Sequence, residues 1–396
     1  MQSLKIENFL GLREANIELD GLTALIGEQA SGKSIIARLI YFFNEYFAGF
    51  DEIALLKQEH KKAYDSRKKI DFCKIFPKYT WENEEFSITY KNIFHEITLS
   101  SAGKSELLKF NTSASVSAYF REMKTQFKIF HESFPEAERY AQTRMLREFR
   151  RMRDTLETVR YDSPLFVPAA RSFYATIREE IFSILSLDEK IDKIIMQFGE
   201  FYESAKLGSS FSRERQDRPT GAFPSTRSER DYFLSIAKGQ YRRADNRDWI
   251  EMERGRIELS KASSGQQEAV PLLFAISRFP APGKTLIIEE PEAHLFPVSQ
   301  VEIMDFIVKQ SVNRKTSILF TTHSPYLLSA LNNHMLRGSK SMERGIEPSK
   351  VRAYAIDKGK VISIIDKDAE LISADYIDSV SEKISEDFLK VLQSNA

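Results

Sequence analysis

Residues 27–34 read Gly27-Glu28-Gln29-Ala30-Ser31-Gly32-Lys33-Ser34 and fit the pattern G-x-x-x-x-G-K-[S/T] of a phosphate-binding loop. Two glycines let the backbone curl so that successive N–H groups point at phosphate oxygens, and a helix that begins near Lys33 directs its positive end at the same anion. In this pattern the lysine reaches the β- and γ-phosphates of a nucleotide, and the Ser34 hydroxyl ligates Mg²⁺. A Gly/Ser surface turn that ends a strand is the alternative explanation of so short a match.

The flanking residues favour the phosphate loop, because that motif needs a strand before it and a helix after it. Residues 22–26 are a short apolar run, and residues 35–47 carry apolar side chains at helical spacing. Upstream, the alternation over 4–9 and 15–19, broken at Gly11, predicts a hairpin. The candidate nucleotide-binding residues of this segment are Gly27, Glu28, Gln29, Ala30, Ser31, Gly32, Lys33, Ser34 and Ile35.

Composition limits the class of protein. Of 396 residues 42% are hydrophobic, which is ordinary for a globular chain and excludes a disordered one. Lys plus Arg number 57 and Asp plus Glu number 57, so any contact with nucleic acid needs a local basic patch. The single cysteine, Cys73, excludes a disulfide framework and a Cys-x-x-Cys zinc site. With no run of about 18 apolar residues, we expect a cytoplasmic protein that does not span a membrane.

The long segment between residues 34 and 263 shows both strand-like and helix-like patterns. Alternation over 70–110 predicts an antiparallel sheet, and residues 113–160 turn helical. The arginine-rich part, 136–160, is either a solvated helix face or a patch for a phosphate backbone or an acidic partner. Residues 208–230 read as a loop, and 232–243 as a helix.

These patterns give a predicted division into three parts. Residues 1–112 hold the phosphate loop and the antiparallel sheet, and residues 113–256 form a mostly helical insertion. Residues 257–396 carry the remaining motifs, a strand pair near 351–365 and an acidic amphipathic helix over 374–392.

A second motif follows a predicted strand in the last part. Residues 285–288 read Thr-Leu-Ile-Ile, a buried type of strand, and lead into Glu289 and Glu290. Neighbouring side chains of a strand point to opposite sides, so at the strand end one carboxylate can meet a metal while the next meets a different atom. We assign Glu289 to Mg²⁺, and Glu290 to orienting or deprotonating the attacking water of a phosphoryl transfer. Acidic residues at an ordinary strand exit are the alternative.

Two further segments point to the same chemistry. Residues 262–268 form a small-residue turn before a helix, which presents a hydroxyl, N–H groups and a helix N-terminus together. The turn is a second anion site or an ordinary N-cap, and we expect Pro271 to interrupt its helix. The candidate residues are Ser263, Ser264, Gly265 and Gln266. His323 follows a predicted strand over 317–320, where its imidazole can bond a γ-phosphate oxygen or cap the next helix.

Taken in this order, the segments resemble the ABC-type ATPases in their chromosome-maintenance and RecF-like branch. The resemblance is strongest to the AAA-annotated bacterial branch that holds OLD-family nucleases and the PtuA-like and AriA-like ATPase subunits of phage-defence systems. It covers about 1–47 and 257–331, and between them only Val167-Pro168-Ala169-Ala170-Arg171 matches, loosely. By this resemblance 27–34 would be Walker A, 263–267 the signature, Glu289–Glu290 Walker B with its catalytic glutamate, and His323 the switch histidine.

The sequence departs from the pattern of that family at several positions. The signature has Ala262 and Ser264 where Leu and Gly are common, and Walker B has Glu289 where Asp is usual. The resemblance implies an α/β fold, namely an ABC-type P-loop ATPase head with a mixed sheet flanked by helices, and an inserted β-plus-helical lobe. It also implies hydrolysis of ATP with Mg²⁺, with Lys33, Glu290 and His323 as the catalytic residues.

The expected partners follow from the same resemblance. Two copies would pair head to tail, with Ser263 and Gly265 of one copy capping ATP bound by the other. The expected role is the sensor or regulator of a phage-defence complex that controls a separate nuclease or toxin. Only about 65 residues follow Leu331, which is too few for the nuclease domain of OLD-family enzymes. One alternative is a RecF-like repair or recombination ATPase that clamps duplex DNA directly, and another is a nucleotide-dependent scaffold with negligible turnover. DNA or RNA is a possible partner.

Overall fold

The computed structural model describes residues 2–50, 59–103, 108–132, 149, 161–176, 192–206, 227–245, 247–373, 385–386 and 390. Three predicted segments lie wholly or largely outside these residues. They are the arginine-rich stretch 136–160, the loop 208–230 and the C-terminal helix 374–392. The loop prediction was wrong for 227–230, which belong to a helix that begins at Arg227.

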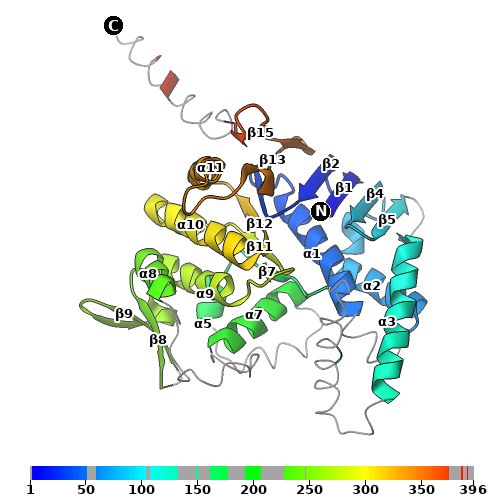
Figure 1. Ribbon diagram of the computed structural model, residues 1–396, viewed down its shortest axis with the longest axis horizontal. Coiled ribbons are helices and arrows are strands. Elements are labelled where there is room, and N and C mark those ends of the chain that lie inside the picture. Colours follow the sequence, from blue (N-terminus) through cyan, green and yellow to red (C-terminus); the bar gives the residue numbers. More distant parts are fainter. Residues whose placement is uncertain are drawn as a thin grey trace.

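One mixed sheet forms the centre of the molecule (Figure 1). Its eleven described strands lie in the order β6-β5-β4-β1-β2-β14-β13-β3-β12-β11-β7. Their bounds are β1 Gln2–Phe9, β2 Leu12–Leu19, β3 Leu22–Gly27, β4 Glu85–Lys91, β5 Glu96–Ala102, β6 Lys109–Thr112, β7 Leu165–Val167, β11 Thr285–Glu289, β12 Ser317–Thr322, β13 Val351–Asp357 and β14 Lys360–Ser363. Two smaller sheets contain β8 Gln240–Ala244, β9 Arg247–Met252 and β10 Gly255–Glu258, and β15 Ile365–Asp366 and β16 Leu371–Ile372.

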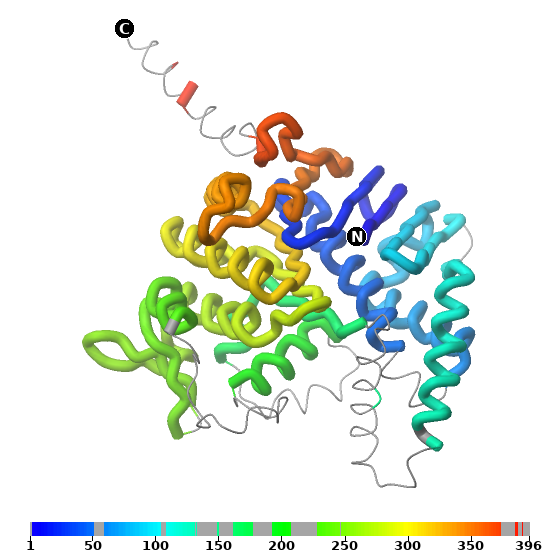
Figure 2. Tube along the Cα trace, viewed as in Figure 1, coloured from blue at the N-terminus to red at the C-terminus, as the bar shows by residue number. Residues whose placement is uncertain are grey.

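The two sides of the large sheet differ in strand direction. Strands β6, β5, β4, β1 and β2 are joined by antiparallel pairs, as the alternation in the sequence predicts. Strands β13, β3, β12, β11 and β7 run parallel. Figure 2 shows the consequence for the chain, because the N-terminal strands in blue lie beside the orange strand β13 from near the C-terminal end. The predicted fold class, a mixed sheet flanked by helices, is confirmed.

Helices cover both faces of the parallel strands (Figure 1). Their bounds are α1 Lys33–Gly49, α2 Lys61–Ile75, α3 Ala114–Glu132, α5 Ser172–Thr176, α7 Lys193–Lys206, α8 Arg227–Ile236, α9 Ser264–Arg278, α10 Pro297–Arg314 and α11 Pro325–Ser339, with short 3-10 turns at Lys78–Thr80, Leu259–Lys261 and Pro348–Lys350. Strand alternation divides the core between the two layers. Ile287 and Leu319 pack with α1, whereas Ile288 and Phe320 pack with α9 and α10.

Helix α1 follows the phosphate loop and fills the middle of one layer. Fourteen of its 17 residues are buried, including Tyr41, Phe43 and Phe47. A helix that is buried on nearly every side lies inside a core and not on its surface. Each of its large side chains contributes roughly 1.5 to 3 kcal/mol by leaving water. The phosphate loop is therefore held between a buried strand and a buried helix.

Three further local predictions were wrong at element ends. Helix α2 continues to Ile75, so the alternating segment begins later than residue 70. The predicted helix over 232–243 ends at Ile236, because Lys238 adopts a left-handed φ of 55° and the chain enters strand β8. Helix α9 continues through Pro271 to Arg278. Burial of the residues around Pro271 stabilises the helix despite the lost hydrogen bond.

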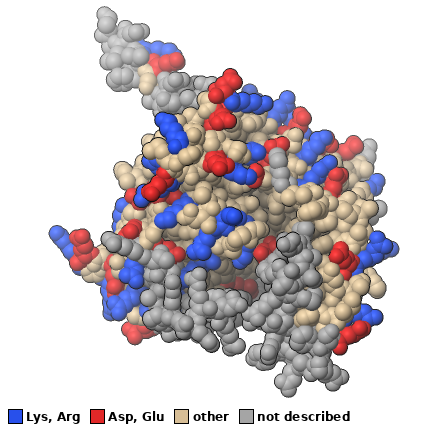
Figure 3. Space-filling model, in the orientation of Figure 1, with Lys and Arg blue, Asp and Glu red and all other residues tan. Residues whose placement is uncertain are grey.

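The division into 1–112, 113–256 and 257–396 stays a prediction, and the structure adds one fact about it. Strand β7 comes from the middle range but pairs with β11 in the large sheet. No helix in the described part of the chain is long and apolar enough to cross a membrane. On the face shown in Figure 3, acidic and basic side chains are interspersed, as expected for a chain of zero net charge.

Candidate functional site

The phosphate loop joins β3 to α1 by a backbone that requires glycine at one point. Gly32 has φ 110° and immediately precedes α1. A Cβ there would lie 2.8 Å from Cδ2 of Leu12, closer than real Cβ contacts, so both conformation and space demand glycine. No side chain caps the N-terminus of α1. Its first N–H groups are therefore available to an anion.

Lys33 lies inside this loop. Its ammonium donates to the carbonyl oxygens of Gly27 and Glu28, both at 2.7 Å, and the residue is only 5% exposed. Burial lowers the pKa of Lys33, while the carboxylates of Glu290 and Glu292 act in the opposite direction. The ammonium thus feels both acids, although its direct partners are neutral carbonyls. A phosphate group would offer it an anionic partner.

Strand register brings the two main motifs to one edge of the sheet. Glu289 of β11 pairs with Thr321 of β12, and Thr321 pairs with Leu25 of β3. Neighbouring strands lie about 4.8 Å apart, so roughly 10 Å separates the ends of β11 and β3. The predicted chemistry needs Lys33 and Glu290 at one site, and both lie at this edge, close enough for the Glu290 carboxylate to act on the pKa of Lys33. The roles assigned to these residues stay predictions.

Glu290 occupies an unusual conformation at the end of β11. Its φ of 44° is left-handed, and its N–H donates to the backbone oxygen of Thr321 at 3.0 Å. Such a conformation costs of order 1 kcal/mol in a residue other than glycine and persists only where neighbouring contacts hold it. Its Oε1 lies 3.4 Å from Nε2 of His323, and the two side chains are 40% and 35% exposed. The pair is open on one side.

The residues at this edge also suit Mg²⁺. Glu289 is buried, Ser34 is exposed, and neither the carboxylate nor the hydroxyl has a hydrogen-bond partner within the described ranges. Mg²⁺ prefers oxygen ligands and is usually held by one or two carboxylates together with substrate phosphates and water. Those ranges contain no cluster of three or more His, Cys, Asp or Glu that could hold an ion. A metal held by Glu289, Ser34 and a phosphate fits this arrangement.

Glu292 lies at the same edge and is a site residue that the sequence patterns did not predict. Its Oε1 accepts from the Thr322 hydroxyl and from the N–H of His323, both at 2.7 Å. Its Oε2 is buried and has no hydrogen-bond partner among the residues that the structure describes. The carboxylate therefore fixes the backbone that carries His323. The third acid of the run Glu289-Glu290-Pro291-Glu292 was the signal for it in the sequence.

The predicted second anion site lies at the N-terminus of α9. Ser263 is its N-cap and forms a reciprocal capping box with Gln266. At Gly265 a Cβ would lie 2.8 Å from the backbone oxygen of His294, so only glycine permits this approach. The Gln266 amide donates to the carbonyl of Ala237 at 3.0 Å. None of the hydrogen bonds described for this turn reaches residues 27–35.

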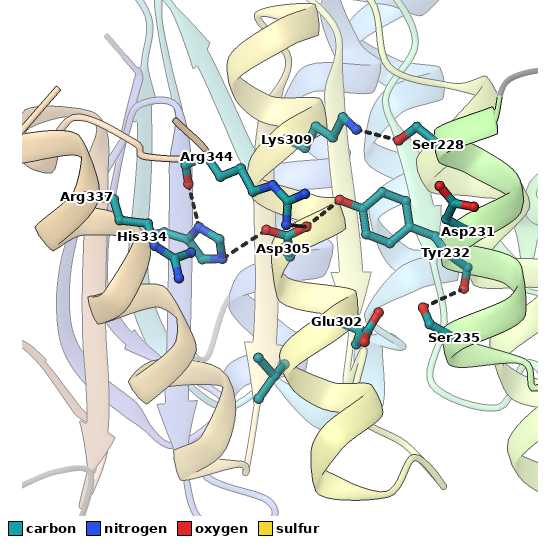
Figure 4. A pocket seen from close by; sticks show the side chains of 11 residues that line it. Ser228, Asp231, Tyr232, Ser235, Glu302, Asp305, Lys309, His334, Arg337 and Arg344 are labelled. Carbon is teal, nitrogen blue, oxygen red and sulfur yellow. Dashed lines mark hydrogen bonds and ion pairs between the residues drawn. The ribbon is translucent and has the colours of Figure 1, made fainter. Parts of the chain in front are cut away.

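A separate polar pocket of about 400 Å³ lies among α8, α10 and α11 (Figure 4). Asp305 is its centre, and it accepts a hydrogen bond from the Tyr232 hydroxyl. Nε2 of His334 lies 3.7 Å from Asp305, and Nδ1 lies 2.6 Å from the carbonyl oxygen of Arg344. The pocket contains none of the predicted site residues, and its lining mixes both signs of charge.

A comparison with solved structures finds similar chains. A head domain of the chromosome-maintenance protein Smc, bound to a winged-helix domain of ScpA, has 16% identity and a TM-score of 0.42, over 93% of this chain and 98% of that one. The corresponding head from Thermotoga maritima has 13% identity and a TM-score of 0.37, over 91% and 97%. The dimeric ABC transporter cassette MJ0796 has 13% identity and a TM-score of 0.35, over 91% and 96%.

These structural scores are all below 0.5, and a search of the curated proteins found no match. The assignment therefore rests on the family comparison, in which residues 1–328 match the model described as an AAA ATPase domain. Because the match covers 328 of 396 residues, the chain belongs to this family and is an ATP-hydrolysing enzyme of the P-loop type.

Proposed function

We propose that this ATPase is a nucleotide-driven switch in which two copies associate head to tail. The support for the proposal is that one chain carries two turns of an anion-binding type, with no hydrogen bond between them in the described residues. One contains Lys33 and Glu290 at the sheet edge, and the other is the capped N-terminus of α9 at Ser263. One ATP needs only one phosphate loop. In a head-to-tail dimer, the phosphate loop of one copy and the α9 turn of the other would bind the same triphosphate.

In this proposal each side chain at the sheet edge has one task. Lys33 leaves the carbonyls of its own loop and neutralises the β- and γ-phosphates, and Ser34 and Glu289 hold Mg²⁺. Glu290 orients and deprotonates the attacking water, and His323 donates a hydrogen bond to the γ-phosphate. From the second copy, Ser263, Ser264, Gly265 and Gln266 present a hydroxyl and helix N–H groups to the same phosphate.

Closure would then depend on the γ-phosphate, and hydrolysis would release the dimer. The ligand favours the closed state only because it contacts both copies there and one copy in the open state. We further propose that this cycle controls a separate effector, a nuclease or a toxin, in a phage-defence complex. The support is the motif resemblance, together with the lack of a three-ligand metal cluster for a nuclease in the described residues.

Size-exclusion chromatography with light scattering tests the switch. The Glu290→Gln protein binds ATP but does not hydrolyse it, so with ATP and Mg²⁺ its mass should double. Lys33→Ala is the matched control and should stay at the mass of one chain under the same conditions. Glu290→Gln protein that remains monomeric with saturating ATP would contradict the head-to-tail switch.

The effector requires a second experiment. ATP-loaded Glu290→Gln protein is used to capture partners from the source cell, and the captured protein is added back to test whether ATP controls its activity. Captured DNA or RNA, bound with strong salt dependence, would instead favour a nucleic-acid clamp. Charge reversal at Arg147, Arg150 and Arg151 should then abolish the binding, although these arginines lie outside the described residues.

A further inference from the structure

Arg171 is a buried cation that ends the loosely matching stretch 167–171 and has no role in the proposed mechanism. It follows strand β7 and is 0% exposed. Its Nη1 donates to the carbonyl oxygen of Glu289 at 2.7 Å, and its Nη2 donates to that of Glu290 at 3.0 Å. These are the backbone oxygens on either side of the left-handed turn at Glu290. The guanidinium therefore holds the backbone that aims both site carboxylates.

The other side of the same guanidinium is bound to α9. Nε of Arg171 donates to the carbonyl oxygen of Glu268 at 3.2 Å and lies 3.3 Å from Oε2 of that residue. Both carboxylate oxygens of Glu268 are used, because Oε2 accepts from the N–H of Arg171 at 2.9 Å and Oε1 from the N–H of Ser172 at 3.0 Å. Glu268 is 3% exposed, so no water competes for these contacts.

Glu268 lies close to the turn that we propose meets the ATP of a second copy. It is the fifth residue of α9, which places it about 6 Å along the axis from the first residue of the helix. The path from Ser263 to Glu290 thus consists of less than two helical turns, one ion pair and two hydrogen bonds. The path consists of a helix, a carboxylate, a planar guanidinium and backbone carbonyls, so it has few bonds about which it can rotate. A shift of the α9 N-terminus should therefore reach the backbone at Glu290.

We infer that the Arg171–Glu268 pair transmits the position of the α9 N-terminus to the backbone at Glu289 and Glu290, which makes Arg171 a positioning residue for ATP hydrolysis. This inference rests on the proposed function, since it is the second copy that would move the turn. In the closed dimer the turn fixes Glu268, Arg171 keeps both carbonyls in place, and Glu290 is aimed at the water. In the open state the constraint on α9 is absent.

The test uses Arg171→Lys and Glu268→Gln in the full chain. Lysine keeps the charge but replaces the planar fork of donors by a single compact ammonium, which cannot reproduce the geometry of these bonds, and glutamine keeps the shape but removes the anion. For a positioning role the turnover at saturating ATP should fall about 30-fold while the ATP dissociation constant changes less than about threefold. ATP-dependent dimerisation should persist when either change is combined with Glu290→Gln. A turnover equal to that of the wild type in folded Arg171→Lys overturns the inference.

Arg38→Lys is the matched control. Arg38 pairs with Asp192 at 2.7 Å, joins two segments of the chain, and is partly exposed. The same chemical change there should leave turnover within about twofold. A drop of equal size in both variants would show that loss of any such arginine slows the enzyme, and would overturn the specific role of Arg171.

Hydrogen exchange tests the inference without a substitution at Arg171 or Glu268. In the Glu290→Gln protein, ATP should slow exchange in peptides that cover 168–172 and 286–290, in addition to 263–268, when dimers form. Dimers with unchanged exchange at 168–172 overturn the inference even where the link variants fail to fold. If Glu290→Gln forms no dimer with ATP, the proposed switch fails first, so the two failures are distinguishable.

Discussion

Two histidine–carboxylate pairs lie in different regions of this molecule. At the sheet edge His323 and Glu290 are 3.4 Å apart, and between α10 and α11 His334 and Asp305 are 3.7 Å apart. The first pair is 35% and 40% exposed, whereas His334 is 3% exposed and has both ring nitrogens near oxygen atoms. The distance between histidine and carboxylate is similar in the two pairs, but the exposure of the histidine to solvent differs. A histidine beside an acid indicates a reactive site only where one side remains open and a ligand-binding group lies nearby.

The largest expected effect is a difference in ATP turnover between a lysine substitution at the sheet edge and one beside the His334 pocket. Lys33→Ala removes the ammonium from the phosphate loop, and we expect ATP turnover to fall by about 1000-fold. Lys309→Ala is the control, because Lys309 bonds Ser228 beside the His334 pocket and should change turnover by less than about twofold. Phosphate release at saturating ATP measures both. Wild-type turnover in Lys33→Ala would remove the basis of the comparison.

The two histidines should differ next. We expect His323→Ala to lower turnover about 100-fold, since it removes a group that meets the γ-phosphate in our proposal. His334→Ala should keep the turnover of the wild type per folded molecule. The same phosphate-release measurement at matched folded concentrations decides this. Equal losses in the two variants would mean that the pocket and the sheet edge act as one site.

Stability should show the opposite order. His334→Ala removes the buried ring that contacts the carbonyl of Arg344 and lies 3.7 Å from Asp305, while Asp305 keeps its hydrogen bond from Tyr232. We expect the free energy of unfolding to fall by about 2 kcal/mol. His323→Ala, at a half-open position, should change it by less than about 0.5 kcal/mol. Urea unfolding at neutral pH measures the difference. A larger loss for His323→Ala would contradict the burial argument.

The smallest effect concerns pH. Burial lowers the pKa of His334 below its usual 6.5, although the Arg344 carbonyl and Asp305 act in the opposite direction and Arg337 and the Arg344 side chain add to the lowering. The neutral form is thus favoured in the folded protein, and its contribution to stability is present above pH 6.5 and is lost as the pH falls through the lower folded-state value.

His334→Gln should therefore reduce the loss of unfolding free energy as the pH falls below 6.5, by at most about 1.4 kcal/mol per pH unit. Tyr232 and Asp305 also face the ring, and the pKa of Tyr232 is raised by burial, so it stays protonated throughout. Burial lowers the pKa of His95 as well, so some slope should remain. An unchanged slope in His334→Gln would exclude His334 as its source.

Local spacing made most of the sheet and the phosphate-loop edge predictable. Residues 27–34 and Glu289–Glu290 each carry their signal within a few positions, and alternation predicted the hairpin of β1 and β2. Strand β8 was missed because the apolar spacing of the helix continues from Tyr232 through Lys238 to Arg243. The chain turns at Lys238, and Tyr241 then packs against Phe274, a contact that the sequence does not indicate.

The Arg171–Glu268 pair was beyond the reach of sequence patterns. The two residues are 97 positions apart, and each alone reads as an ordinary charged residue. The stretch 165–171 reads as a short buried strand that ends in an arginine, but nothing in it indicates that β7 joins the sheet beside β11, and the pair depends on that neighbour. Charges that pair across distant segments are decided by topology.

Strand β3 has consequences for biosynthesis. It leads into the phosphate loop, yet its two sheet neighbours, β12 and β13, follow it by about 300 residues of chain. At about 5 to 20 residues per second, a ribosome needs about 15 to 60 s to make that length. During this time a nascent chain carries an apolar strand with both edges unpaired, which is a target for chaperones and a nucleus for aggregation. Messages cut short before the codon for residue 317 should yield insoluble fragments.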